Sequence, residues 1–373
     1  MIKVFCAPAR YVQGPDATFA LGQESHRLGL GQSAFLIAGL SAKRQLETVW
    51  DASFAEAGIH HVVIDFGGEC SSAEIERLKT AAIQARAEFV VGAGGGKVLD
   101  TARAVAAALA LRVVCCPTVA ASDAPCSASS VVYTPQGEFE KYLNFSRNPD
   151  LVLVDTRVIV KAPVRLLIAG MGDALATRFE AETAISSFKG NGVGGLSTIA
   201  AAQIADLCYQ TLLRDGVAAV AAARQGAVTP AFERIVEANT LLSGLGFESG
   251  GLAVAHSVHN GLTVAPETHA FLHGEKVAFG TLVQLVLEGR ERRLIEEVMT
   301  FCLEVGLPIA LEDLGLAHMS EAQAEAIAAR AVAPGETAHN EPFIVTPSAI
   351  RDAIWATDAL ARDFKCRSGL VRT

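Results

Sequence analysis

Residues 89–101 have the sequence FVVGAGGGKVLDT, in which an apolar run leads into four glycines within five positions and then into a helical pattern. Glycine permits a tight turn and a close approach of backbone amides to a ligand, and the first turn of the following helix offers free N–H groups and a partial positive charge. The dinucleotide fingerprint GxGxxG would need glycine at Lys97, and a P-loop would need serine or threonine at Val98. We therefore predict an atypical pyrophosphate-binding turn at 94–96, with a purely structural turn as the alternative.

Around this turn, the first 160 or so residues alternate short apolar, β-branched runs with amphipathic segments such as Ala73–Ala87 and Thr101–Leu111. Such alternation indicates βαβ units and a parallel sheet buried on both faces, whose ligands lie at the carboxyl ends of the strands. The predicted strands are Ala34–Ala38, His61–Phe66, Glu88–Val91, Val113–Cys116 and Leu151–Val154.

Beyond Pro163, strand patterns nearly vanish and Ala- and Leu-rich helical patterns dominate. The predicted helices are Leu166–Phe188, Gly195–Arg214, Pro230–Leu245, His273–Glu288, Glu291–Val305, Glu321–Ala331 and Pro347–Phe364. The sequence thus predicts a Rossmann-like α/β domain over 1–162 and an all-helical domain over 163–373, which is consistent with a chain too long for one core.

Composition excludes several classes of protein. The net charge of −9 argues against nucleic acid as a partner. Apolar runs stay far below the roughly 20 residues that cross a bilayer, and the first residues lack the apolar core of a secretory signal. The eight cysteines include no CxxC pair, so we expect reduced thiols. Together, these features lead us to expect no membrane partner and a cytoplasmic protein.

Histidines gather in the second half, where four of the nine lie between 256 and 273. His256 and His259 are three residues apart, and His269 and His273 are four apart, so each pair is expected on one helical face. Asp173 stands at the entrance of a long Ala-rich helix, where a role as the N-terminal cap is the simpler explanation. One Asp with two His is nevertheless a plausible catalytic zinc set that leaves a position for substrate. Sequence alone does not choose among the four histidines.

A second loop, Pro117–Ser127, follows the fourth predicted strand and is rich in hydroxyl groups, with Asp123 as its one carboxylate. It is expected at the same edge of the sheet as the glycine turn. A polar turn in which Asp123 caps a helix is the alternative.

Taken together, these motifs resemble the glycerol dehydrogenase branch of the iron-containing alcohol dehydrogenase superfamily. The resemblance runs through the whole chain in order, and the sequence GFESGGLAVAHSVHNGLT at 246–263 is its most specific part. The other matching segments are Gly94–Ala102, Pro117–Ser127, Met171–Ala176, His273–Ala278 and Gly335–Asn340. The resemblance implies a dehydroquinate synthase-like fold, in which 1–162 binds a nicotinamide dinucleotide and 163–373 binds metal and substrate.

The resemblance also implies roles for individual residues. Asp173, His256 and His273 become the metal ligands, and Asp123 a partner of a substrate hydroxyl. His256 and His259 are expected near the reacting groups, with His259 as a proton carrier or a structural residue. The implied cofactor contacts are Gly39, Gly94, Gly95, Gly96, Lys97, Asp100, Thr118, Ser122, Ser127 and Tyr133. The iron branch carries a histidine where Thr177 stands, which favours Zn²⁺ over iron.

The expected activity is zinc-dependent oxidation of glycerol or another vicinal diol, with hydride transfer to NAD and dihydroxyacetone as the product from glycerol. NADP is the alternative cofactor, because Gly39 replaces the usual acidic residue and Lys43 and Arg44 follow. The resemblance also implies a ring-like homo-oligomer, with an octamer as one option.

Three other functions stay open at this stage. A 2-oxo acid reductase of the same superfamily would need a cation for the substrate carboxylate, and the motifs offer only Lys97 and Lys276. A 3-dehydroquinate synthase-like lyase would need a glutamate at Asp173. A binding protein without activity would have no need of the Asp/His/His set.

Overall fold

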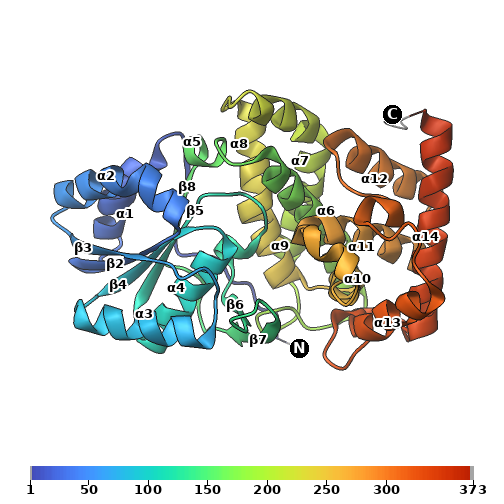
Figure 1. Ribbon diagram of the computed structural model, residues 1–373, viewed down its shortest axis with the longest axis horizontal. Coiled ribbons are helices and arrows are strands. Elements are labelled where there is room, and N and C mark those ends of the chain that lie inside the picture. Colours follow the sequence, from blue (N-terminus) through green and yellow to red (C-terminus); the bar gives the residue numbers. More distant parts are fainter. Residues whose placement is uncertain (1, 370–373) are drawn as a thin grey trace. The chain divides into compact units, whose positions relative to one another are not determined.

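The computed structural model describes residues 2–369, which form two compact units (Figure 1). One unit comprises Cys6–Val164 and Ala222–Gly244. The other comprises the residues up to Phe5, then Arg165–Ala221, and the chain from Leu245 onward. The predicted functional division of the chain at 162/163 remains a prediction. Residues Ala222–Gly244 lie in the second of these predicted domains but pack with the α/β unit.

A six-stranded, fully parallel sheet in the order β1-β8-β5-β4-β2-β3 forms the centre of the α/β unit. The predicted parallel sheet is confirmed, and all five predicted strands are present, with no end displaced by more than three residues. The strands of the sheet are β1 (Tyr11–Gly14), β2 (Ser33–Ala38), β3 (His60–Asp65), β4 (Phe89–Gly94), β5 (Arg112–Pro117) and β8 (Leu151–Asp155).

Three strands escaped the sequence analysis. Edge strand β1 has four half-buried residues and pairs only with β8. Strands β6 (Ser129–Tyr133) and β7 (Phe139–Asn144) form a separate antiparallel hairpin, and β7 is almost wholly exposed, so it lacks an apolar alternation. Short or exposed strands leave little hydrophobic pattern to detect.

Helices cover both faces of the sheet, with α1 and α2 on one face and α3 and α4 on the other (Figure 1). Trp50 and Phe54 of α2 pack with Leu36 and Phe89 of the sheet in one core. The helices of this unit are α1 (Leu21–Arg27), α2 (Leu40–Glu56), α3 (Ser72–Gln84), α4 (Gly96–Ala108), α5 (Thr156–Ile159) and α8 (Pro230–Glu237), with short 3₁₀ turns η1 (Ala17–Ala20) and η2 (Ala124–Cys126).

The second unit is helical, as predicted, and its described residues include no strand longer than the single bridge between Lys3 and Leu196. Apolar residues of α10, among them Val254 and Val258, pack with Phe279 and Ile354 in its core. Its helices are α6 (Val164–Ser186), α7 (Ile199–Arg224), α9 (Ser243–Gly250), α10 (Val254–Leu262), α11 (His273–Leu287), α12 (Arg292–Val305), α13 (Glu321–Ala331) and α14 (Pro347–Ser368), with 3₁₀ turns η4 (Pro266–Ala270), η5 (Leu311–Leu314) and η6 (Thr337–Asn340).

The helix predicted over Pro230–Leu245 is present, but it is not a regular α-helix. Helix α8 ends at Glu237 and is followed by a π-helical turn, η3 (Ala238–Leu242), before α9 begins. The side chain of Thr240 donates to the carbonyl of Val236, and the side chain of Asn239 donates to the carbonyl of Ala120 outside the helix. π-turns of this kind are frequent at functional sites.

Among residues 2–369, no helix is both long enough and apolar enough to span a membrane.

Candidate metal centre and cofactor loops

Asp173 is fully buried in α6, and two glycines bring it beside the first residue of α11. A Cβ on Gly274 would lie 1.7 Å from the carbonyl oxygen of Ala169, and a Cβ on Gly172 would lie 2.3 Å from the carbonyl oxygen of Gly274. The backbones of α6 and α11 are therefore in direct contact. This contact places His273, one residue before Gly274, with its Nε2 at 3.0 Å from Asp173 Oδ1.

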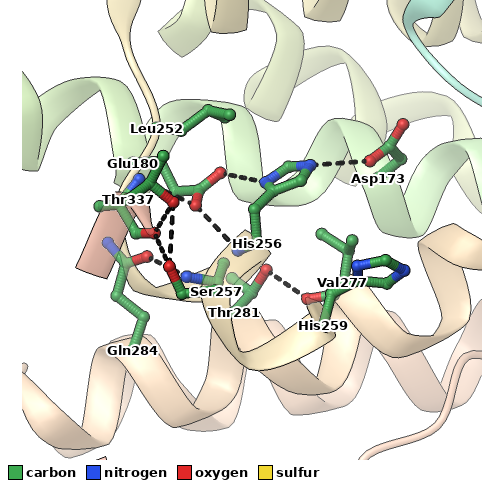
Figure 2. Close-up of polar contacts among 12 residues, drawn as sticks. Asp173, Glu180, Leu252, His256, Ser257, His259, Val277, Thr281, Gln284 and Thr337 are labelled. Carbon is green, nitrogen blue, oxygen red and sulfur yellow. Dashed lines mark hydrogen bonds and ion pairs between the residues drawn. The ribbon is translucent and has the colours of Figure 1, made fainter. Parts of the chain in front are cut away.

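His256 comes from the first turn of α10 and is fixed by Glu180, which lies seven residues after Asp173 on α6. Glu180 Oε1 accepts hydrogen bonds from the backbone N–H groups of Ala253 and His256, each at 3.0 Å, and thus caps the N-terminus of α10. Glu180 Oε2 lies 2.6 Å from His256 Nδ1. Figure 2 shows the His256 ring between the carboxylates of Glu180 and Asp173. The distance from His256 Nε2 to Asp173 Oδ1 is 3.4 Å.

His259 contacts the ring of His273. Its Nε2 lies 2.9 Å from His273 Nδ1, and its Nδ1 lies 3.0 Å from Asn260 Oδ1. Asn260 Nδ2 donates to Glu336, so the amide oxygen faces His259. Assigned from these partners, His259 carries its proton on Nδ1 and accepts from the Nδ1–H of His273, so Nε2 is the His273 nitrogen that faces Asp173 and would bind a metal.

The carboxylate and the two histidines therefore converge, with one ligand atom from each of Asp173, His256 and His273 within 4.8 Å of the others. Their outer nitrogens are engaged by Glu180 and His259, an arrangement typical of metal-bound histidines. Asp173 is 0% exposed whereas the His273 side chain is 42% exposed, so the cluster opens to one side. The donor set fits a divalent cation with a free coordination position.

The pKa values of the residues in this cluster are shifted by the same close contacts. Burial alone would raise the pKa of Asp173, but His273 and His256 hold it well below its usual value. Burial disfavours a charge on His256, yet the carboxylates of Glu180 and Asp173 raise its pKa well above the usual value. Burial, followed by the neighbouring His273 and Lys276, lowers the pKa of His259. His259 is therefore neutral and suited to hold His273, and its role as a proton carrier remains a prediction.

The expectation that His269 and His273 share one helical face is wrong. His269 belongs to the 3₁₀ turn η4, and the extended residues Phe271 and Leu272 separate it from α11. Its Nε2 lies 3.0 Å from the carbonyl oxygen of Thr263. The structure thus gives His269 a local contact and leaves it out of the metal cluster.

The glycine turn between β4 and α4 contains two kinds of glycine. A Cβ on Gly92 would lie 2.6 Å from Ala102 Cβ, and a Cβ on Gly94 would lie 2.6 Å from Val98 Cγ2, so these two allow the helix to pack on the strand. A Cβ on Gly96 would meet nothing within 4 Å, and one on Gly95 would meet only Val119, at 3.8 Å. Gly95 and Gly96 thus leave open space at the N-terminus of α4, where no side chain caps the helix.

Other predicted cofactor residues surround this turn. Lys97 forms an ion pair with Glu69 at 2.5 Å and lies over the Tyr133 ring at 5.4 Å. The backbone N–H of Thr118 donates to the carbonyl of Gly94 at 3.0 Å. Ser127 is buried, and its hydroxyl donates to the carbonyl of Ala124 at 3.0 Å. Ser122 is half-buried in the same loop.

Asp100 lies inside the unit. Its carboxylate pairs with Arg103, which also donates to the carbonyl of Ala124, while the backbone oxygen of Asp100 accepts from the Ser130 hydroxyl. These contacts tie α4 to the loop of Asp123 and to β6. A cofactor contact of Asp100 stays a prediction beside this internal role.

Gly39 precedes α2, and its N–H donates to the carbonyl of Ala93 at 3.0 Å. Four residues later, Lys43 forms an ion pair with Asp65 at 2.8 Å. Asp65 ends β3 and is registered with Ala38 of β2. Sequence reasoning missed this carboxylate because it belongs to the neighbouring strand.

The side chain of Asp123 does not cap η2, so the alternative explanation of Asp123 as a helix cap is wrong. Its Oδ2 accepts a hydrogen bond from the Ser243 hydroxyl at 3.0 Å, and Asn239 donates to the carbonyl of Ala120 in the same loop. A Cβ on Gly244 would lie 3.0 Å from the carbonyl oxygen of Asp123. The π-turn and the start of α9 therefore hold the Asp123 loop, and no sequence pattern pointed to Asn239 or Ser243.

A parallel α/β unit with an open glycine turn and a helical unit with an Asp/His/His cluster, joined in one chain, fit the class of oxidoreductases that use a dinucleotide and a metal ion. Comparison with known proteins agrees. The model of the family described as iron-containing alcohol dehydrogenase matches residues 8–156.

Two curated relatives and one solved structure match over nearly the full length. A glycerol dehydrogenase from Thermotoga maritima is 50% identical over 97% of this chain and 98% of its own. A glycolaldehyde reductase from Halobacterium salinarum is 46% identical over 98% of this chain and 100% of its own. The crystal structure of glycerol dehydrogenase from Schizosaccharomyces pombe superposes with a TM-score of 0.96 at 38% identity, covering 100% of this chain and 94% of the other. The chain belongs to the iron-containing alcohol dehydrogenase family, and the predicted family and fold are confirmed.

Proposed function

We propose that this chain oxidises glycerol, or a closely related vicinal diol, with zinc and NAD, and that glycerol yields dihydroxyacetone. The observation that carries the proposal is the convergence of Asp173, His256 and His273 within 4.8 Å, in a chain whose relatives include glycerol dehydrogenases. The reaction removes a proton from a hydroxyl group and a hydride from the carbon that bears it, so it needs a charge beside the oxygen and an acceptor for the hydride.

Asp173, His256 and His273 would hold the metal. A divalent cation bound there would lower the pKa of a substrate hydroxyl and stabilise the negative charge that develops on its oxygen. Zinc is the preferred ion, because two nitrogens and one carboxylate with an open position are a catalytic zinc set. In addition, Thr177, one turn after Asp173, offers no fourth imidazole. Glu180 and His259 keep the two rings oriented.

The nicotinamide dinucleotide would bind at the carboxyl ends of the strands, with its pyrophosphate at Gly95 and Gly96 and at the free N-terminus of α4. The ion pair of Lys43 with Asp65 supports NAD over NADP, since Asp65 neutralises the cation that a 2′-phosphate would need. Lys97 and Tyr133 would contact the cofactor from the other side of the turn.

Asp123 would bind a substrate hydroxyl. Its carboxylate is held by Ser243 and its loop by Asn239, so the group is positioned before substrate arrives. A fixed acceptor for one hydroxyl orients the neighbouring carbon for hydride transfer. We also propose that residues 1–162 serve the cofactor and residues 163–373 the metal and substrate, in a cytoplasmic homo-oligomer.

A second candidate is the reduction of a small hydroxyaldehyde, because the relative from Halobacterium salinarum is a glycolaldehyde reductase at 46% identity. The same residues would act in that direction, with the hydride passing from the reduced cofactor to the carbonyl carbon.

The test is a set of initial rates with the zinc-loaded protein. Glycerol, 1,2-propanediol and 2,3-butanediol are oxidised with NAD or NADP, and dihydroxyacetone, glycolaldehyde and a 2-oxo acid are reduced with the corresponding reduced cofactor. We expect the highest kcat/KM for glycerol and dihydroxyacetone with NAD and NADH. A higher value for glycolaldehyde favours the second candidate, and no turnover of any diol or hydroxycarbonyl compound rejects the proposal.

A further inference from the structure

Glu341 is a buried carboxylate outside the metal cluster. It directly follows the 3₁₀ turn η6, and it is only 3% exposed although Pro342 and Phe343 beside it are exposed. Within residues 2–369, neither of its carboxylate oxygens has a hydrogen-bond partner. Burying a carboxylate without a partner costs several kcal/mol if the group is charged, so this side chain needs a counter-charge or a proton.

A cavity of about 320 Å³ lies beside Glu341. Two more carboxylates, Glu182 and Glu288, line it, together with the hydroxyl groups of Thr183 and Ser186. Every potential ligand here is an oxygen, in contrast to the imidazole nitrogens beside Asp173, and the two groups of residues have no member in common.

Arg290 also lines the cavity and compensates part of its charge. Its Nε pairs with Glu288 Oε2 at 2.5 Å and its Nη1 with Glu182 Oε1 at 3.0 Å. Glu288 Oε1 accepts from Thr183 at 2.6 Å and from Gln284 at 2.8 Å, which fixes that carboxylate at the cavity wall. Three carboxylates and one guanidinium leave a formal charge of −2 when all are ionised.

Burial raises the pKa of Glu341 to about 8, and the carboxylates of Glu288 and Glu180 act in the same direction. Arg290 lowers it, as does the backbone N–H of Val254, which lies near the carboxylate without reaching hydrogen-bonding geometry, but both effects are smaller. Without a further cation, the carboxyl group of Glu341 is therefore largely protonated at neutral pH.

We propose that this cavity binds one hard divalent cation, of the Ca²⁺ or Mg²⁺ type, through Glu341 and Glu288 with the hydroxyl groups and water completing its coordination. Oxygen-only donors and several retained waters are what these ions require. One divalent cation neutralises the formal charge of −2. The same ion is the counter-ion that the buried carboxylate of Glu341 lacks.

The test uses the full chain in chelator-treated buffer, titrated calorimetrically at pH 7 with CaCl2 and then with MgCl2. We expect one ion per chain. Because binding removes the proton of Glu341, the heats in two buffers of different ionisation enthalpy should reveal release of nearly one proton per ion, falling toward zero at pH 9.

Two variants and a control locate the site. E341Q should stay folded, because it replaces a buried acid with a neutral side chain of the same shape. It should lower the affinity for the ion at least tenfold, and E288Q should do the same. E304Q removes an exposed acid of α12 and should bind like the unaltered chain. D173A should keep the affinity, since it alters only the other cluster.

Three results would overturn the proposal. The first is the absence of saturable binding of either ion up to about 1 mM, the weak end of protein calcium sites. The second is an unchanged affinity in E341Q, and the third is binding that D173A abolishes. Binding of K⁺ instead of a divalent ion, with the same dependence on Glu341, would overturn the assignment of the ion's charge.

Discussion

Glu180 and His256 are joined twice, by a side-chain contact of 2.6 Å between Oε2 and Nδ1 and by a bond of 3.0 Å from the backbone N–H of His256 to Oε1. One carboxylate thus caps helix α10 and aims the imidazole of its first turn at Asp173. The orientation of the proposed metal ligand and the start of the helix depend on the same side chain.

Replacing Glu180 should therefore weaken metal binding without removing a ligand. We expect E180A to lose about 10- to 100-fold in zinc affinity, the usual cost of losing the partner of a metal-bound histidine. Competition with a coloured chelator measures the affinity. E304A, which removes an exposed glutamate of α12, should leave it unchanged. Equal affinity in E180A would show that Glu180 has no part in holding His256 for the metal.

The contact of α6 with α11 predicts a second outcome. In G274A the added Cβ would lie 1.7 Å from the Ala169 carbonyl, so the helices must separate and Asp173 must move from His273. We expect a loss of about 3 kcal/mol in the free energy of unfolding, together with weaker zinc binding. Denaturant unfolding and chelator competition provide the two values. A variant as stable as the unaltered chain would refute the close contact.

The two kinds of glycine before α4 should respond differently to alanine. G94A should lower stability, because its Cβ would lie 2.6 Å from Val98 Cγ2. G96A has open space, so its stability should change by no more than about 0.5 kcal/mol, while KM for NAD rises because the methyl group occupies the place of the pyrophosphate. Thermal unfolding and the dependence of rate on NAD concentration separate the two effects. An unchanged KM in G96A would favour a purely structural turn.

Removing the hydroxyl that holds Asp123 should affect the substrate more than the cofactor. A hydrogen bond to a charged group contributes about 1.5–3 kcal/mol, so S243A should lower kcat/KM for glycerol roughly tenfold to a hundredfold. KM for NAD should stay the same. S25A, which removes the hydroxyl of another buried serine, in α1, is the matched comparison. If S243A and S25A behave alike, Ser243 does not position Asp123.

The sequence predicted the features that depend on local pattern and left out those created by packing. The apolar run before Gly92 marks a buried strand, and the glycines after it mark the turn, so both could be found without coordinates. The choice of His256 and His273 over His269 could not, since it depends on the non-helical break at Phe271 and Leu272. Only the resemblance to the family selected the pair that lies beside Asp173.

The supporting residues were missed for a related reason. Glu180 acts on a helix that begins more than 70 residues later, and Ser243 reaches a loop 120 residues earlier. The π-turn that aims Asn239 at Ala120 differs from an α-helix in hydrogen bonding and not in hydrophobic period. Contacts at such sequence separation leave no signature in composition or spacing.

The most direct test of the metal centre is anomalous diffraction at the zinc absorption edge from crystals of the zinc-loaded chain. The account predicts one strong peak per chain, at about 2.0–2.2 Å from a carboxylate oxygen of Asp173 and from Nε2 of His256 and of His273. A peak held by other residues, or no peak at these three side chains despite excess zinc, would contradict it.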